Sequence, residues 1–128
     1  MNFKYLLLGV AFAILAGCNA VPIRNIADAP VVTGSGKPAT AEQVRGAIVS
    51  AGNGLGWTMT PTTPGLVTGH LALRGHSAII EARYTRSTYS LLYKDSSNLG
   101  HQGDQIHKNY NSWIENLNRD IRAKLMSL

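Results

Sequence analysis

Hydrophobic and polar residues alternate through the middle of the chain, which is typical of strands with one buried face. In the clearest case, Ala78, Ile80 and Ala82 fall on one face while Glu81 and Arg83 fall on the other. The segments with strand-forming composition are residues 57–62, 66–73, 77–85 and 88–94. Their spacing and the turn residues between them predict about four strands joined as antiparallel hairpins.

Helical periodicity flanks these segments on both sides. Thr40 and Gln43 have the spacing of a capping box, and the helix that follows should end at Gly52-Asn53-Gly54. Its apolar stripe consists of Val44, Ala47, Ile48 and Ala51. A second amphipathic stripe consists of Ile106, Tyr110, Trp113, Ile114, Leu117, Ile121 and Leu125. The fold class expected is α+β: an N-terminal helix, an antiparallel sheet of about four strands, and a C-terminal amphipathic helix packed on the sheet.

The chain before Thr40 divides into a leader and a linker. Residues 1–17 have a basic start and a short apolar run that ends in small residues, as secretory signal peptides do. Residues 18–39 contain Pro22, Pro30, Pro38 and the stretch Gly34-Ser35-Gly36, without either regular period. We therefore expect a signal peptide over 1–17, a flexible tether over 18–39 and a single domain over 40–128.

The tetrapeptide Leu15-Ala16-Gly17-Cys18 resembles the lipobox of bacterial lipoproteins. The resemblance implies cleavage before Cys18 and attachment of fatty acyl chains such as palmitate, with the thiol acting as nucleophile. Asn19 stands where an Asp would favour retention in the inner membrane of enterobacteria. By analogy, the protein is expected to be lipid-anchored in the outer membrane and to face the periplasm.

Composition excludes some classes of partner and chemistry. The chain has 128 residues and a formal net charge of +5, with its basic residues scattered singly rather than clustered. This pattern argues against nucleic-acid binding, although the mild excess suits an anionic envelope polymer. The single cysteine allows no intramolecular disulfide.

The sequence lacks a recognisable catalytic motif, and we assign no catalytic residue, no metal site and no cofactor. His70, His76, His101 and His107 do not follow the spacing of a metal-binding motif. A rival hypothesis remains: an envelope domain that binds a small ligand or metal, or is enzymatic, through His70, His101 or His107 with Asp104. A third is a structural spacer of the envelope.

Two polar segments, residues 93–98 and 106–113, are the most distinctive in the chain. They are rich in Asn, Ser and other hydrogen-bonding side chains, which either form a recognition surface or cap turns and the helix. The candidate recognition residues are Lys94, Asp95, Ser96, Asn98, Lys108, Asn109 and Asn111. The leading hypothesis is an interaction module that presents this region or a sheet edge to an envelope protein or an anionic envelope polymer.

The chain contains the short motifs Gly56-Trp57, Pro64-Gly65, Tyr89-Ser90, Tyr93-Lys94-Asp95-Ser96, Asn98-Leu99 and the run from Ile106 to Leu117. In these motifs it resembles a group of small proteobacterial lipoproteins of unassigned function. The resemblance covers nearly all of residues 43–122, and one departure from it is the segment 100–104. The resemblance implies a fold and a location, but it brings no catalytic residues.

Overall fold

The computed structural model describes residues 19–128, so the predicted signal peptide and Cys18 lie outside the described residues. This part of the chain contains seven strands and two helices and belongs to the α+β class. In chain order the elements are β1 (Ala20–Pro22), β2 (Ile26–Pro30), α2 (Ala41–Gly54), β3 (Thr58–Thr63), β4 (Leu66–Leu73), β5 (His76–Tyr84), β6 (Thr88–Ser97), β7 (Gln105–His107) and α3 (Lys108–Met126).

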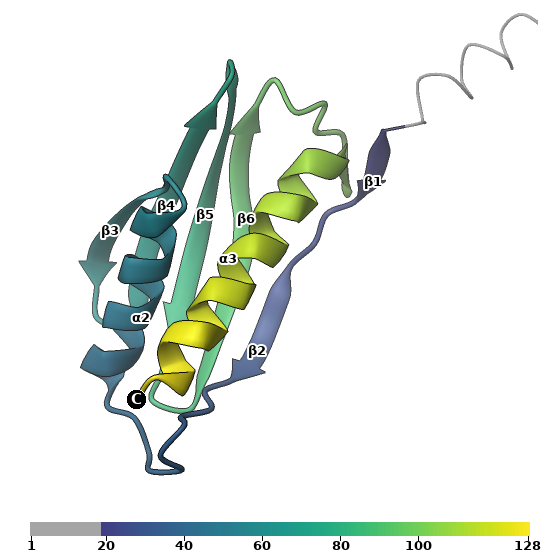
Figure 1. Cartoon of the computed structure of the whole chain (residues 1–128). Helices are drawn as coiled ribbons and strands as arrows, with labels where there is room; N and C mark the ends of the chain where they lie inside the picture. The colour runs from purple at the N-terminus through teal and green to yellow at the C-terminus, as the bar shows by residue number, and fades with distance from the viewer. Residues whose placement is uncertain (1–18) are drawn as a thin grey trace, which may run out of the picture.

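The strands form one large antiparallel sheet and one small ribbon (Figure 1). The large sheet has the order β2-β6-β5-β4-β3, and β1 pairs separately with β7. Both helices pack on the same face of the large sheet, with α3 lying along β6 and beside α2. The domain therefore has two layers.

The prediction of about four strands is wrong, because segments outside the four hairpin strands also pair. Those four strands are present as β3 to β6 with small shifts of their ends. β2 joins the edge of the sheet, where Ile26 pairs with Leu91 and Ala29 pairs with Tyr89. β1 and β7, each three residues long, add the small ribbon.

The prediction of a flexible tether over 18–39 is likewise wrong for the described residues. Ile26 is buried in the core, and its strand pairs with β6. Pro22 and Pro30 are the last residues of β1 and β2. At the end of a short edge strand a missing N–H costs little, so these prolines limit the strands without preventing them.

The helix after Thr40 has the expected cap. The Thr40 hydroxyl accepts a hydrogen bond from the Gln43 backbone N–H at 3.1 Å, and the Gln43 side chain accepts one from the Thr40 N–H at 2.9 Å. Two strands precede this helix in the described chain, so the fold does not open on a helix as expected.

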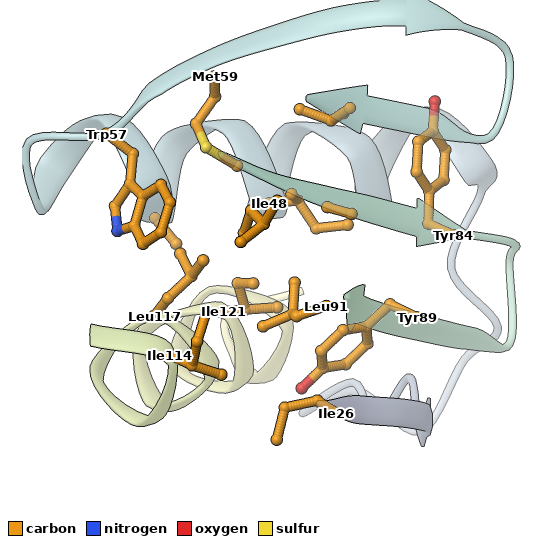
Figure 2. Packing of buried hydrophobic residues seen from close by; sticks show 14 of the residues in the cluster. Ile26, Ile48, Trp57, Met59, Tyr84, Tyr89, Leu91, Ile114, Leu117 and Ile121 are labelled. Atoms are coloured by element: carbon orange, nitrogen blue, oxygen red, sulfur yellow. The ribbon is translucent and has the colours of Figure 1, made fainter. Parts of the chain in front are cut away.

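The hydrophobic core lies between the two helices and the sheet (Figure 2). Alternation in β5 is confirmed, since Ala78, Ile80 and Ala82 are all buried. The stripe of α3 needs two corrections. Ile106 is buried but belongs to β7, because His107 caps the helix, and Trp113 is only partly buried at the edge of the core.

Candidate functional site

The predicted recognition residues gather at one end of the molecule, where β6 ends and α3 begins (Figure 1). Part of this set is engaged within the fold. Lys94 Nζ lies 3.6 Å from a Glu81 carboxylate oxygen, and Asp95 accepts a hydrogen bond from the Ser96 N–H at 2.8 Å. The Asn98 side chain donates to the Gly75 carbonyl at 3.2 Å and so ties the β6 end to the β4–β5 hairpin.

An aromatic cluster lies beneath the loop that joins β6 to β7. The Tyr93 ring lies 4.8 Å from the His101 ring and meets Tyr110 edge-on at 5.6 Å, measured between ring centroids. The Tyr93 hydroxyl is 2.8 Å from Ser96 Oγ. This clustering was not evident in the sequence, because Tyr93, His101 and Tyr110 come from a strand, a loop and a helix.

Tyr110 is the most buried member of this cluster. Its hydroxyl is enclosed and has no hydrogen-bond partner among residues 19–128. Burial raises the pKa of this phenol above its usual value, and the neighbouring Tyr93 raises it further. A phenol is protonated at neutral pH even at its ordinary pKa, and this rise keeps the proton on the Tyr110 hydroxyl to still higher pH.

Lys108 and Asn109 lie in the first turn of α3, and both side chains are exposed. Their backbone groups are engaged instead. The Lys108 N–H donates to the Asn19 carbonyl at 3.0 Å, and the Asn109 N–H donates to His107 Nδ1 at 3.1 Å. Both side chains thus remain available to an external partner.

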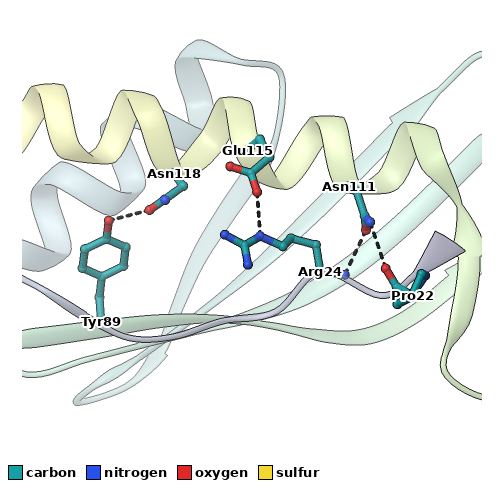
Figure 3. Close-up of polar contacts among 6 residues, drawn as sticks. All are labelled: Pro22, Arg24, Tyr89, Asn111, Glu115 and Asn118. Carbon is teal, nitrogen blue, oxygen red and sulfur yellow. Dashed lines mark hydrogen bonds and ion pairs between the residues drawn. The ribbon is translucent and has the colours of Figure 1, made fainter.

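Asn111 has a structural role that the sequence did not reveal (Figure 3). Its amide nitrogen donates to the Pro22 carbonyl, and its amide oxygen accepts from the Arg24 N–H, both at 2.9 Å. An ion pair of 2.6 Å between Arg24 and Glu115 lies one turn farther along α3. The Asn111 amide therefore pairs with the Pro22 carbonyl and the Arg24 N–H as a neighbouring backbone would, and it holds the segment between β1 and β2 against α3.

These contacts fix the position at which the chain enters the fold. β1 pairs with β7 from Ala20 opposite His107 to Pro22 opposite Gln105. The Ile23 N–H continues this contact by donating to the Asp104 carbonyl at 2.8 Å. Asn19 is consequently held beside the start of α3, one residue after Cys18.

Asn111→Ala should open the entering segment locally. The variant loses two hydrogen bonds, each typically worth about 1 kcal/mol, while the core beneath α3 stays packed. We expect hydrogen exchange of the Arg24 amide to accelerate by about tenfold or more, since ~1.4 kcal/mol corresponds to a factor of ten. Asn109→Ala is the matched control, because the Asn109 side chain makes no hydrogen bond within residues 19–128. Equal exchange in the two variants would contradict the role assigned to Asn111.

The histidines of the rival hypothesis have separate local roles. His107 caps α3, and His101 contacts Tyr93 and the Gly103 carbonyl, 3.0 Å from its Nε2. His70 lies on β4 opposite Thr58 and Ile79. Among residues 19–128, no three His, Cys, Asp or Glu side chains are grouped so that they could hold a metal ion.

Neither helix between residues 19 and 128 combines the length and the apolar composition needed to span a bilayer. Comparisons of the chain with protein-family models, with curated proteins and with solved structures gave no match.

Proposed function

We propose that this chain is a lipid-anchored lipoprotein of the bacterial outer membrane that faces the periplasm and acts as a binding module. The resemblance of Leu15-Ala16-Gly17-Cys18 to a lipobox supports the anchor, and the fixed position of Asn19 supports a binding surface beside that anchor. A lipid on Cys18 would be attached directly to the β1–β7 ribbon, without a long tether between membrane and domain.

This attachment gives the domain a preferred orientation on the membrane. The β6 end, the loop 98–104 and the first turn of α3 would lie next to the lipid headgroups, while α3 leads away from them (Figure 1). α3 has 19 residues. At ~1.5 Å per residue, its far end lies nearly 30 Å from its start.

The surface beside the anchor suits a partner that is itself bound to the membrane. Lys108 and Asn109 offer an exposed cation and an exposed amide beside Asn19. Both the Lys108 ammonium and the Asn109 amide can donate hydrogen bonds to a membrane-bound protein or to an anionic envelope polymer close to the membrane surface. Asn111 is not counted in this surface, because its side-chain amide is already hydrogen-bonded to the entering segment.

The sheet edges are less suitable for binding an added strand. Pro61 interrupts the donor row of the edge strand β3, and β2 carries an irregularity between Ile26 and Ala29 with Asp28 at a φ of 51°. Prolines and bulges at an edge hinder the pairing of another strand. We therefore favour the surface beside the anchor over an exposed edge.

Photo-crosslinking in intact envelopes tests the binding surface. A photoreactive residue is placed at Lys108 or Asn109, and at Arg45 on α2 as the control, all exposed positions. We expect one partner to be captured from Lys108 and Asn109 and not from Arg45, identified by mass spectrometry of the adduct. Capture of no specific partner from the two positions, or of the same partner from Arg45, would contradict this assignment of the surface.

A further inference from the structure

A cavity of about 340 Å³ lies between β2 with the residues that follow it and the C-terminal half of α3. We call it the α3 cavity. Its apolar lining is formed by Ala29, Pro30, Val32, Leu125 and Met126. Cavities that bind small ligands measure roughly 300–1,000 Å³, so this one suits a short chain.

The hydrophobic side chains at its rim are unusually exposed. Val32 is 54% exposed and Met126 is 53% exposed. Within residues 19–128 only one other large hydrophobic side chain, Leu73, is exposed. Two of the three exposed large hydrophobics thus border one cavity, and filling it would remove apolar surface from water.

The polar groups of the α3 cavity are Tyr89, Asn118 and Arg122. The Tyr89 hydroxyl donates to the Asn118 side-chain oxygen, which leaves the Asn118 amide N–H groups without a partner among the described residues (Figure 3). Arg122 makes no ion pair or hydrogen bond to any residue between 19 and 128, and a guanidinium offers donors only. The positive charge of Arg122 also acts on Tyr89, where it partly offsets the rise in pKa caused by burial.

Arg122 is the one charged residue among those that line the α3 cavity. No Asp or Glu lines it. A neighbouring cavity of about 450 Å³ shares Val32 with it and is bordered by Lys37 and Arg86, again without an acidic residue. An anionic group at the Arg122 end would therefore meet attraction from Arg122 and repulsion from no lining carboxylate.

We propose that the α3 cavity binds a single-chain fatty carboxylate, with the apolar chain between Val32 and Met126 and the carboxylate on Arg122 and Asn118. A planar guanidinium and an amide match the geometry of a carboxylate. The volume favours one short chain over the paired chains of a phospholipid. This site does not depend on the lipid anchor, because β2 and α3 build it from described residues.

The test is photo-labelling of the full-length protein in dodecyl maltoside. The probe is decanoic acid with a diazirine at the far end of its chain, and mass spectrometry locates the adducts. The detergent is present in excess and serves as an uncharged competitor. We expect adducts at Val32 or Met126, and unlabelled decanoate should suppress them.

Two variants on α3 distinguish binding of the probe carboxylate by Arg122 from nonspecific adsorption of the probe to the protein surface. Arg122→Gln should lower the labelling yield by about tenfold, as loss of a charged hydrogen bond typically does. Arg119→Gln is the control, because Arg119 is an exposed arginine of the same helix that pairs with Asp120 at 3.2 Å. Equal melting temperatures of the two variants would exclude unfolding as the cause.

Three outcomes would overturn the proposal. The first is labelling spread over the whole surface. The second is an equal yield from Arg122→Gln and Arg119→Gln. The third is equal labelling by the corresponding diazirine alcohol, which has the same chain without the charge. Val32→Glu gives an independent check, since a carboxylate at the rim should repel the probe and reduce the adduct at Met126.

Discussion

Leu117→Ala lowers the free energy of unfolding by about 2–5 kcal/mol, the range measured when a fully buried leucine is truncated. Leu117 is completely buried in the layer between α3 and the sheet (Figure 2). Its truncation leaves a cavity in the core. The surrounding buried side chains relax only partly around such a gap, so the lost contacts are not fully replaced.

Chemical denaturation followed by circular dichroism measures this loss. Asn116→Ala is the matched control, because Asn116 is the preceding residue on α3 and is exposed. The control should change stability by less than about 0.5 kcal/mol. A loss below about 1 kcal/mol for Leu117→Ala would show that the α3 stripe is not the main contact between helix and sheet.

The elements that could be predicted are those whose signal is local. Alternation is visible in β5 because one face of that strand packs on the helices and the other does not. The capping box at Thr40 and Gln43 involves residues three apart and is therefore readable from the sequence. Both features are present as expected.

The entering segment could not be predicted, because its structure depends on distant partners. β1 is three residues long and carries no periodicity, and its partner β7 lies 85 residues away at the central pair, Val21 with Ile106. Prolines favoured a linker over a strand, and only pairing with β6 reveals β2 as an edge strand. The prolines and the lack of periodicity do disfavour a strand locally, but pairing with distant strands stabilises these segments as strands all the same.

The same limit applies to the candidate sites. Asn111 resembled a recognition residue because polar residues near a helix start suit either role, and the hydrogen bonds to Pro22 and Arg24 decide between them. The α3 cavity needs β2 beside α3, so a chain with a free tether would not contain it. Lys108 and Asn109 are exposed, and the hydrogen bond from the Lys108 N–H to Asn19 places them beside the entering segment, which the spacing in the sequence could not indicate.

Cys18→Ser should move nearly all of the protein out of the membrane fraction. Serine lacks the thiol that forms the thioether to the lipid, and stable anchoring requires more than one acyl chain. The wild-type protein should stay in the membrane pellet after carbonate extraction, whereas the variant should not. Mass spectrometry of the wild-type N-terminal peptide should find an acylated residue 18.

Gly17→Ala is the matched control for this experiment, because it keeps a small residue beside the cysteine and should preserve processing and anchoring. The fold itself should be unaffected by Cys18→Ser, since β1, β7 and Asn111 hold the entering segment without the lipid. The released variant should therefore melt at the same temperature as the wild-type protein extracted in detergent. If Cys18→Ser stays in the carbonate-washed membrane with its leader uncleaved, the apolar segment is the anchor, and the orientation proposed from Asn19 no longer rests on a lipid.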